Sequence, residues 1–94
     1  MFYHIVMFKF HDKTDAEEAK SKLEAMVAEI PQLISVAVGV DELQLERSWD
    51  MVLETQFASL ADYQIYAEHP KHNIVLDWLK ARIKSAATVD YTVD

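Results

Sequence analysis

The chain has 94 residues, of which 51% are hydrophobic, and its formal net charge is −7. This length lies in the single-domain range, so we expect residues 1–94 to form one domain with a small core. The negative charge disfavours nucleic acid and anionic membranes as partners, because both are recognised through clustered Lys and Arg. The chain has no Cys, no secretory-type start and no apolar run long enough to span a membrane. We therefore expect a soluble, cytoplasmic protein.

The first expected element, residues 1–10, is a strand that is apolar on both faces. One face carries Phe2, His4, Val6, Phe8 and Phe10, and the other carries Tyr3, Ile5, Met7 and Lys9. A strand of this kind is typically buried on both sides. Further along, Thr14 precedes Glu17 by the spacing of a capping box, and apolar residues then recur at helical intervals up to Pro31. We therefore predict a helix between Thr14 and Pro31.

The middle of the chain predicts two strands joined by a polar hairpin. Residues 33–40 alternate between an apolar face and a face of small side chains, and residues 49–57 alternate between apolar and mostly polar positions. Gly39 indicates a possible bulge in the first of these strands. Ser59 and Asp62 repeat the capping spacing and predict a short helix that ends near Glu68.

Two further elements complete the chain. Pro70 is tolerated at a helix start, and apolar residues at helical spacing predict a last helix that includes Ile83. Residues 87–93 alternate and predict the final strand. The order βαββα(α)β is that of the ferredoxin-like α+β sandwich, whose antiparallel sheet carries its helices on one face. Because the other face would expose a large apolar patch, we expect the chain to pair with itself as a homodimeric α+β barrel.

The chain resembles the stress-responsive α/β-barrel domain family over nearly its whole length. The segments that carry the resemblance are residues 4–10 (HIVMFKF), 49–57 (WDMVLETQF), 66–72 (YAEHPKH) and 89–91 (VDY). The most specific of them is the His-Pro-x-His turn that follows a Tyr. The resemblance implies a homodimer with a β-barrel at its interface. Most members have no assigned reaction, but one plant member is a cofactor-free polyketide cyclase that uses the second His of this turn.

The resemblance to that plant cyclase implies a catalytic role for His72, with His4 and Tyr66 as further pocket groups. The helix dipole disfavours the charged form of an imidazole in the first turn of a helix, and a neutral ring is what a general base needs. His4 could donate to a substrate carbonyl or orient His72. The same residues also permit structural roles, in which His72 caps backbone donors, His4 is a satisfied core residue and Tyr66 is a half-buried interface aromatic.

Bulky apolar side chains are expected between the helices and the sheet, either lining a ligand pocket or filling the space as core. The candidate pocket-lining residues are Val6, Phe8, Leu23, Met26, Trp78 and Leu79. Leu23 stands where the plant cyclase has a Tyr, so one polar group of that site is missing. His69 and His72 are three residues apart, but no third ligand is evident, and one glycine cannot build a phosphate-binding loop. We expect no metal and no cofactor.

Three functions remain open from the sequence. The first is a small cofactor-independent cyclase or isomerase that abstracts a proton beside a carbonyl, with His72 as base and a hydrophobic or polyketide-like ligand. The second is a non-enzymatic dimer that binds a small hydrophobic molecule or protects under stress. The third, weaker alternative is a cofactor-free monooxygenase. An open pocket lined by His72 and His4 would favour the first function, and a filled interior the second.

Overall fold

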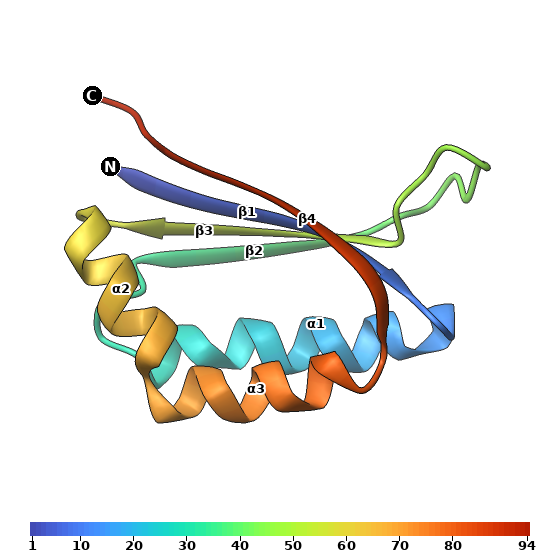
Figure 1. The fold of residues 1–94 in the computed structure, drawn as a ribbon, viewed down its shortest axis with the longest axis horizontal. Coiled ribbons are helices and arrows are strands. Elements are labelled where there is room, and N and C mark those ends of the chain that lie inside the picture. Colours follow the sequence, from blue (N-terminus) through green and yellow to red (C-terminus); the bar gives the residue numbers. More distant parts are fainter.

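The computed structural model describes all residues, 1–94, as a four-stranded antiparallel sheet with its helices on one face (Figure 1). The strands are β1 (Phe2–Phe10), β2 (Ser35–Val40), β3 (Met51–Phe57) and β4 (Ile83–Thr92), and their spatial order is β2-β3-β1-β4. The helices are α1 (Ala16–Ala25), α2 (Leu60–Glu68) and α3 (Pro70–Lys80), and short 3-10 turns flank α1 at Lys13–Asp15 and Met26–Ala28. The predicted ferredoxin-like order is confirmed. None of the helices has the length and apolarity needed to cross a membrane.

Strand β1 is an inner strand, and its two faces meet different surroundings. Phe2, Val6 and Phe8 are buried on the side of the helices, as predicted, whereas Met7 on the opposite side is exposed. No layer covers that opposite side in Figure 1. We call it the open face; alternation and strand register assign to it Tyr3, Ile5, Met7, Ser35, Ala37, Gly39, Val52, Glu54, Gln56, Ala87, Val89 and Tyr91.

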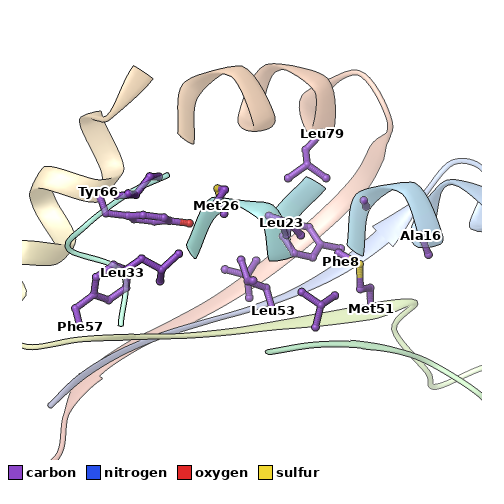
Figure 2. Close-up of a cluster of buried hydrophobic side chains, with 14 of the residues drawn as sticks. Phe8, Ala16, Leu23, Met26, Leu33, Met51, Leu53, Phe57, Tyr66 and Leu79 are labelled. Carbon is purple, nitrogen blue, oxygen red and sulfur yellow. The ribbon is translucent and has the colours of Figure 1, made fainter. Parts of the chain in front are cut away.

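The core lies between the sheet and the helices, where 16 buried hydrophobic residues form one cluster. Figure 2 shows Leu79 pointing from α3 toward the sheet, on the same side as Leu23 and Phe8. Thr55 of β3 is the one buried polar residue, and its hydroxyl donates to the carbonyl oxygen of His4 at 2.8 Å. This hydrogen bond satisfies Thr55 and ties the backbone of β1 to β3 next to His4.

The predicted start of the first helix is wrong. Asp12, in extended backbone conformation, accepts hydrogen bonds from the backbone N–H and the hydroxyl of Thr14, at 3.0 and 2.7 Å. Thr14 is therefore a donor within the first 3-10 turn and not a helix cap. The second predicted start is confirmed, because the hydroxyl of Ser59 accepts the N–H of Asp62 at 3.2 Å and caps α2.

Other boundaries also differ from the prediction. The last helix ends at Lys80, and Ile83 is the first residue of β4. An apolar side chain at this position meets the core equally well from a helix or from a strand, so spacing alone did not reveal the turn.

The β2 and β3 strands start two residues later than expected, at Ser35 and Met51. Gly39 marks no bulge, since the β2–β3 register continues through it. The register shift lies instead between β1 and β4, where Lys9 pairs with Ser85 and Phe10 with Ile83, so that β4 has one extra residue, Lys84.

Phe57 provides a test of the core. Its side chain is 0% exposed, and its ring contacts those of Tyr63 and Tyr66 at centroid distances of 5.4 and 4.9 Å. Phe57→Ala removes these contacts and leaves a cavity, so we expect the free energy of unfolding to fall by about 3–5 kcal/mol in urea denaturation. Ile74→Ala, at a position that is 65% exposed on α3, is the control and should change it by less than about 0.5 kcal/mol. Similar small losses for both variants would contradict the burial of Phe57.

Candidate functional site

A cavity of about 290 Å³ lies between the helices and the β1–β4 part of the sheet. Its lining comes from β1, β3, β4 and all three α-helices and is mostly apolar or aromatic. Its titratable side chains are His4 of β1, Tyr63 and Tyr66 of α2, and His72 of α3; we call these four the polar cluster. Ligand pockets range from about 300 to 1,000 Å³, and this cavity is close to the lower end of that range. Its size therefore suits a small molecule. Two larger hollows, of about 470 and 480 Å³, contain no histidine or tyrosine.

The rings of the polar cluster follow one another in an unbroken series. The centroid distances are 4.8 Å from His4 to Tyr63, 6.0 Å from Tyr63 to Tyr66, and 4.5 Å from Tyr66 to His72. The two tyrosines point the same way because residues three apart share one face of a helix. His72 joins them because α3 starts at Pro70, directly after α2. The series therefore has an imidazole at each end and two phenols between them.

His72 is a neutral ring with one nitrogen free to accept a proton. Its Nδ1 lies 3.0 Å from the carbonyl oxygen of Ala67. A carbonyl only accepts hydrogen bonds, so we assign the ring proton to Nδ1 and the lone pair to Nε2. Burial lowers the pKa of His72, the neighbouring His4 and His69 lower it further, and hydrogen bonds to Ala67 and Asn73 oppose this shift. The ring is therefore available as a base near neutral pH.

His4 is oriented by Asp90. Its Nδ1 donates to Oδ1 of Asp90, which stands directly opposite His4 in the β1–β4 ladder. This contact leaves Nε2 of His4 as the nitrogen available to a ligand. The side chain of His4 is 12% exposed and that of Asp90 is 40% exposed. The pair therefore lies where solvent reaches the polar cluster.

Both tyrosines of the polar cluster remain protonated. Burial raises the pKa of Tyr66 strongly, and the neighbouring Tyr63 adds to the effect. Burial also raises the pKa of Tyr63, with a contribution from the negative charge of Asp90. Figure 2 shows the ring of Tyr66 extending from α2 into the interior. Each phenol can thus donate a hydrogen bond to an oxygen atom of a bound molecule.

The structure brings the three predicted catalytic residues, His4, Tyr66 and His72, to one cavity. Of the six predicted lining residues, the cavity includes Val6, Phe8, Leu23 and Leu79.

The prediction that Met26 and Trp78 line this cavity is wrong, because both residues border a separate groove between α1 and α3. There the ring of Trp78 lies 5.2 Å from the Lys22 ammonium and 4.2 Å from the Arg82 guanidinium carbon. Helical spacing does not distinguish the side of a helix that faces a sheet from the side that faces another helix.

Two residues of the site, Tyr63 and Asp90, received no role from the sequence. The position of Tyr63, three residues before Tyr66, was an available signal, since both must share one helix face. Asp90 alternates with Val89 and Tyr91, which places it on the side of the strand opposite to theirs. Its contact with His4, 86 residues away, depends on the register of β1 with β4, and no local pattern encodes that register.

His69 is not part of the polar cluster. It is the N-cap of α3, and its Nδ1 accepts the backbone N–H of Lys71 at 3.1 Å. The capping role considered for His72 is therefore filled by His69. No group of three or more His, Cys, Asp or Glu side chains is arranged to hold a metal ion.

Solved structures share this fold over almost the full chain. A dimeric protein of unknown function with a ferredoxin-like fold from Bacteroides fragilis is 30% identical, with a TM-score of 0.86, over 98% of this chain and 95% of that chain. A dimeric ferredoxin-like protein of unknown function from Jannaschia is 25% identical, with a TM-score of 0.80, over 98% of both chains. A hydroxynitrile lyase from Passiflora edulis is 13% identical, with a TM-score of 0.85, over 99% of this chain and 93% of that chain, and shows similarity of fold alone.

No curated protein gives a significant match to the sequence. The family description that does match is the stress responsive A/B barrel domain, over residues 2–93. The match spans nearly the whole chain, and the fold agrees with it. The chain therefore belongs to the stress responsive A/B barrel domain family.

Proposed function

We propose that the protein is a cofactor-independent enzyme that removes a proton beside a carbonyl group, as a cyclase or isomerase does. The observation that carries this proposal is the neutral His72, whose Nε2 is free, in the same cavity as two protonated phenols. A base and hydrogen-bond donors at one ligand position are what proton abstraction next to a carbonyl requires. The substrate class is a small, mostly apolar molecule with carbonyl groups, such as a linear polyketide.

The order of the rings suggests how the roles are divided. Tyr66 lies beside His72 and donates to the carbonyl oxygen on which negative charge develops. Nε2 of His72 takes the proton from the adjacent carbon. The resulting enolate carbon either attacks a second carbonyl of the same molecule, as in a cyclase, or takes a proton back, as in an isomerase. His4, oriented by Asp90, is placed at the other end of the polar cluster to bind that second carbonyl.

A second candidate is binding of a small hydrophobic molecule without turnover. The mostly apolar lining of the cavity favours it, because apolar walls supply affinity for such a ligand in either case. The polar cluster separates the two functions. A binding protein needs the shape of the cavity, whereas the enzyme also needs the unprotonated nitrogen of His72.

Replacing His72 tests the proposed base. His72→Ala should lower kcat with a β-polyketo substrate by a factor of about 10²–10⁴, the usual contribution of a general base, and leave the melting temperature nearly unchanged. His69→Asn is the matched control, since it removes a nearby imidazole but keeps a side chain that can cap α3. Unchanged turnover in His72→Ala would remove His72 from the mechanism. Loss of turnover in both variants would point to a structural effect of the turn.

The pH dependence follows from the lowered pKa of His72. Because the buried ring resists protonation, it stays neutral until the pH falls below its ordinary pKa of 6.5. We expect kcat/KM to be level above that value and to decline at lower pH. The unfolded chain takes up this proton first, so the folded state also loses stability as the pH falls below about 6.5. Titration of the His72 ring by NMR measures its pKa directly, and a midpoint at or above 6.5 would contradict the account.

We also propose that the protein is a homodimer that packs through its open face. Large apolar side chains are exposed on this face, among them Met7, Val89 and Tyr91. Monomeric proteins rarely expose contiguous apolar patches of this kind. The similar proteins from Bacteroides fragilis and Jannaschia are described as dimeric, which supports the same assembly here.

Light scattering of the purified chain should give a mass near twice 10.8 kDa. Val89→Asp places a charge on the open face and should shift the mass toward that of the monomer, because an unpaired charge is costly at a packed interface. Ile65→Asp is the control, since Ile65 is exposed on α2, away from the open face. A wild-type monomer, or a Val89→Asp dimer as stable as the wild type, would overturn this assembly.

A further inference from the structure

One carboxylate stands at the centre of the open face. Glu54 of β3 lies opposite Ile5 of β1 on one side and Ala37 of β2 on the other. Its side chain is exposed, and none of the ion pairs within the chain involves it. Neither Ile5 nor Ala37 offers a polar partner. Glu54 is therefore a charged group on a face that is otherwise suited to burial.

The surroundings of Glu54 form a shallow hollow of about 240 Å³. The residues that line it are Tyr3, Ile5, Ser35, Ala37, Glu54, Gln56 and Tyr91. The hydroxyl of Ser35 donates to Oε1 of Gln56 at 2.7 Å, so these two polar side chains already satisfy each other. Tyr3 and Tyr91 stack with a centroid distance of 5.3 Å. The hollow thus contains aromatic rings and small side chains, but no positive charge.

The cations nearest to the open face lie at its two ends. The N-terminal ammonium of Met1, which donates to the carbonyl oxygen of Val93 at 3.0 Å, lies at one end, and Lys9 lies at the other. Lys9 of β1 places its ammonium 4.9 Å from the ring centroid of Trp49. It is four residues from Ile5, which corresponds to about 13 Å along a strand. Lys84 borders a polar hollow at the same end. Asp41 and Glu42, in the loop before β3, border the open face there and add negative charge.

We propose that the open face is a proton-linked interface between two copies of this chain, in which Glu54 is enclosed, so that uptake of protons strengthens the dimer. This inference rests on the homodimer proposed above. The occupant is a second copy, because the dimeric similar proteins cover nearly the same length of chain. A symmetric two-fold contact uses the same patch on both copies, so a contact centred on the hollow brings two Glu54 side chains into one enclosed region.

The direction of the pH effect follows from the charges on both sides of this contact. Each copy brings Glu54 and the phenol side chains of Tyr3 and Tyr91 to the contact, with Lys9 at one end of β1 and the N-terminal ammonium at the other. Removing two carboxylates from water, close to one another and far from a cation, disfavours their charged forms. Association is therefore accompanied by binding of protons, and the dimer becomes weaker as the pH rises.

The test compares the wild type, Glu54→Gln and Glu24→Gln by analytical ultracentrifugation of dilution series at about pH 5 and about pH 8. Glu24 is the matched control, because it is an exposed glutamate of α1, on the helix side of the sheet. We expect the dissociation constant of the wild type and of Glu24→Gln to rise by a factor of about 10 or more between the two pH values. That of Glu54→Gln should stay low and vary little, because the neutral amide keeps the shape of the side chain without the charge.

The outcomes separate this inference from the proposed homodimer. A wild type that is monomeric at both pH values would overturn the homodimer and the proton linkage together. A dimer whose pH dependence is the same in Glu54→Gln as in the wild type would overturn the proton linkage alone. A dimer weakened by Glu54→Gln would also overturn it, since it would show that a donor or cation of the second copy holds the charged carboxylate.

Discussion

The pairing of β1 on both of its edges is the constraint on which the rest of the structure depends. β3 and β4 each run antiparallel to it over most of its length. As an inner strand, β1 sends alternate side chains to the two sides of the sheet. Phe2, Val6 and Phe8 anchor the core under the helices, while Tyr3 and Met7 lie on the open face. One strand thus determines both the buried layer and the surface available to a second copy.

The same pairing assembles the candidate site from distant parts of the chain. His4 comes from the first strand and Asp90 from the last, and the register of these two strands brings them into contact. Thr55 adds a hydrogen bond from β3 to the backbone at His4, so this residue is tied to both neighbouring strands. His72 enters from the helical side, where the turn between α2 and α3 directs its ring toward Tyr66. The polar cluster therefore lies between a rigid sheet and a helical layer.

The two sides of the sheet differ in whether their carboxylates have a partner within the chain. On the helix side, Asp90 has a partner in His4, and the buried tyrosines stay neutral, so the polar groups suit a ligand that needs hydrogen bonds. On the open face, Glu54 has no such partner within the chain. Because β4 carries Asp90 toward one side and Tyr91 toward the other, the site and the proposed interface are adjacent in sequence and separated by the thickness of the sheet.

The sequence alone determined the order of the elements, the face of β1 that points to the helices, the cap at Ser59 and the helix start at Pro70. These features depend on alternation, helical spacing and local hydrogen bonds, which a short stretch of chain contains in full. It also pointed to His4, Tyr66 and His72, through residue type and family resemblance. Only the tertiary structure decided that Ile83 starts a strand, that Met26 and Trp78 border another groove, and that Asp90 orients His4. Those features depend on strand register and on how helices pack against the sheet, which are contacts between residues far apart in the chain.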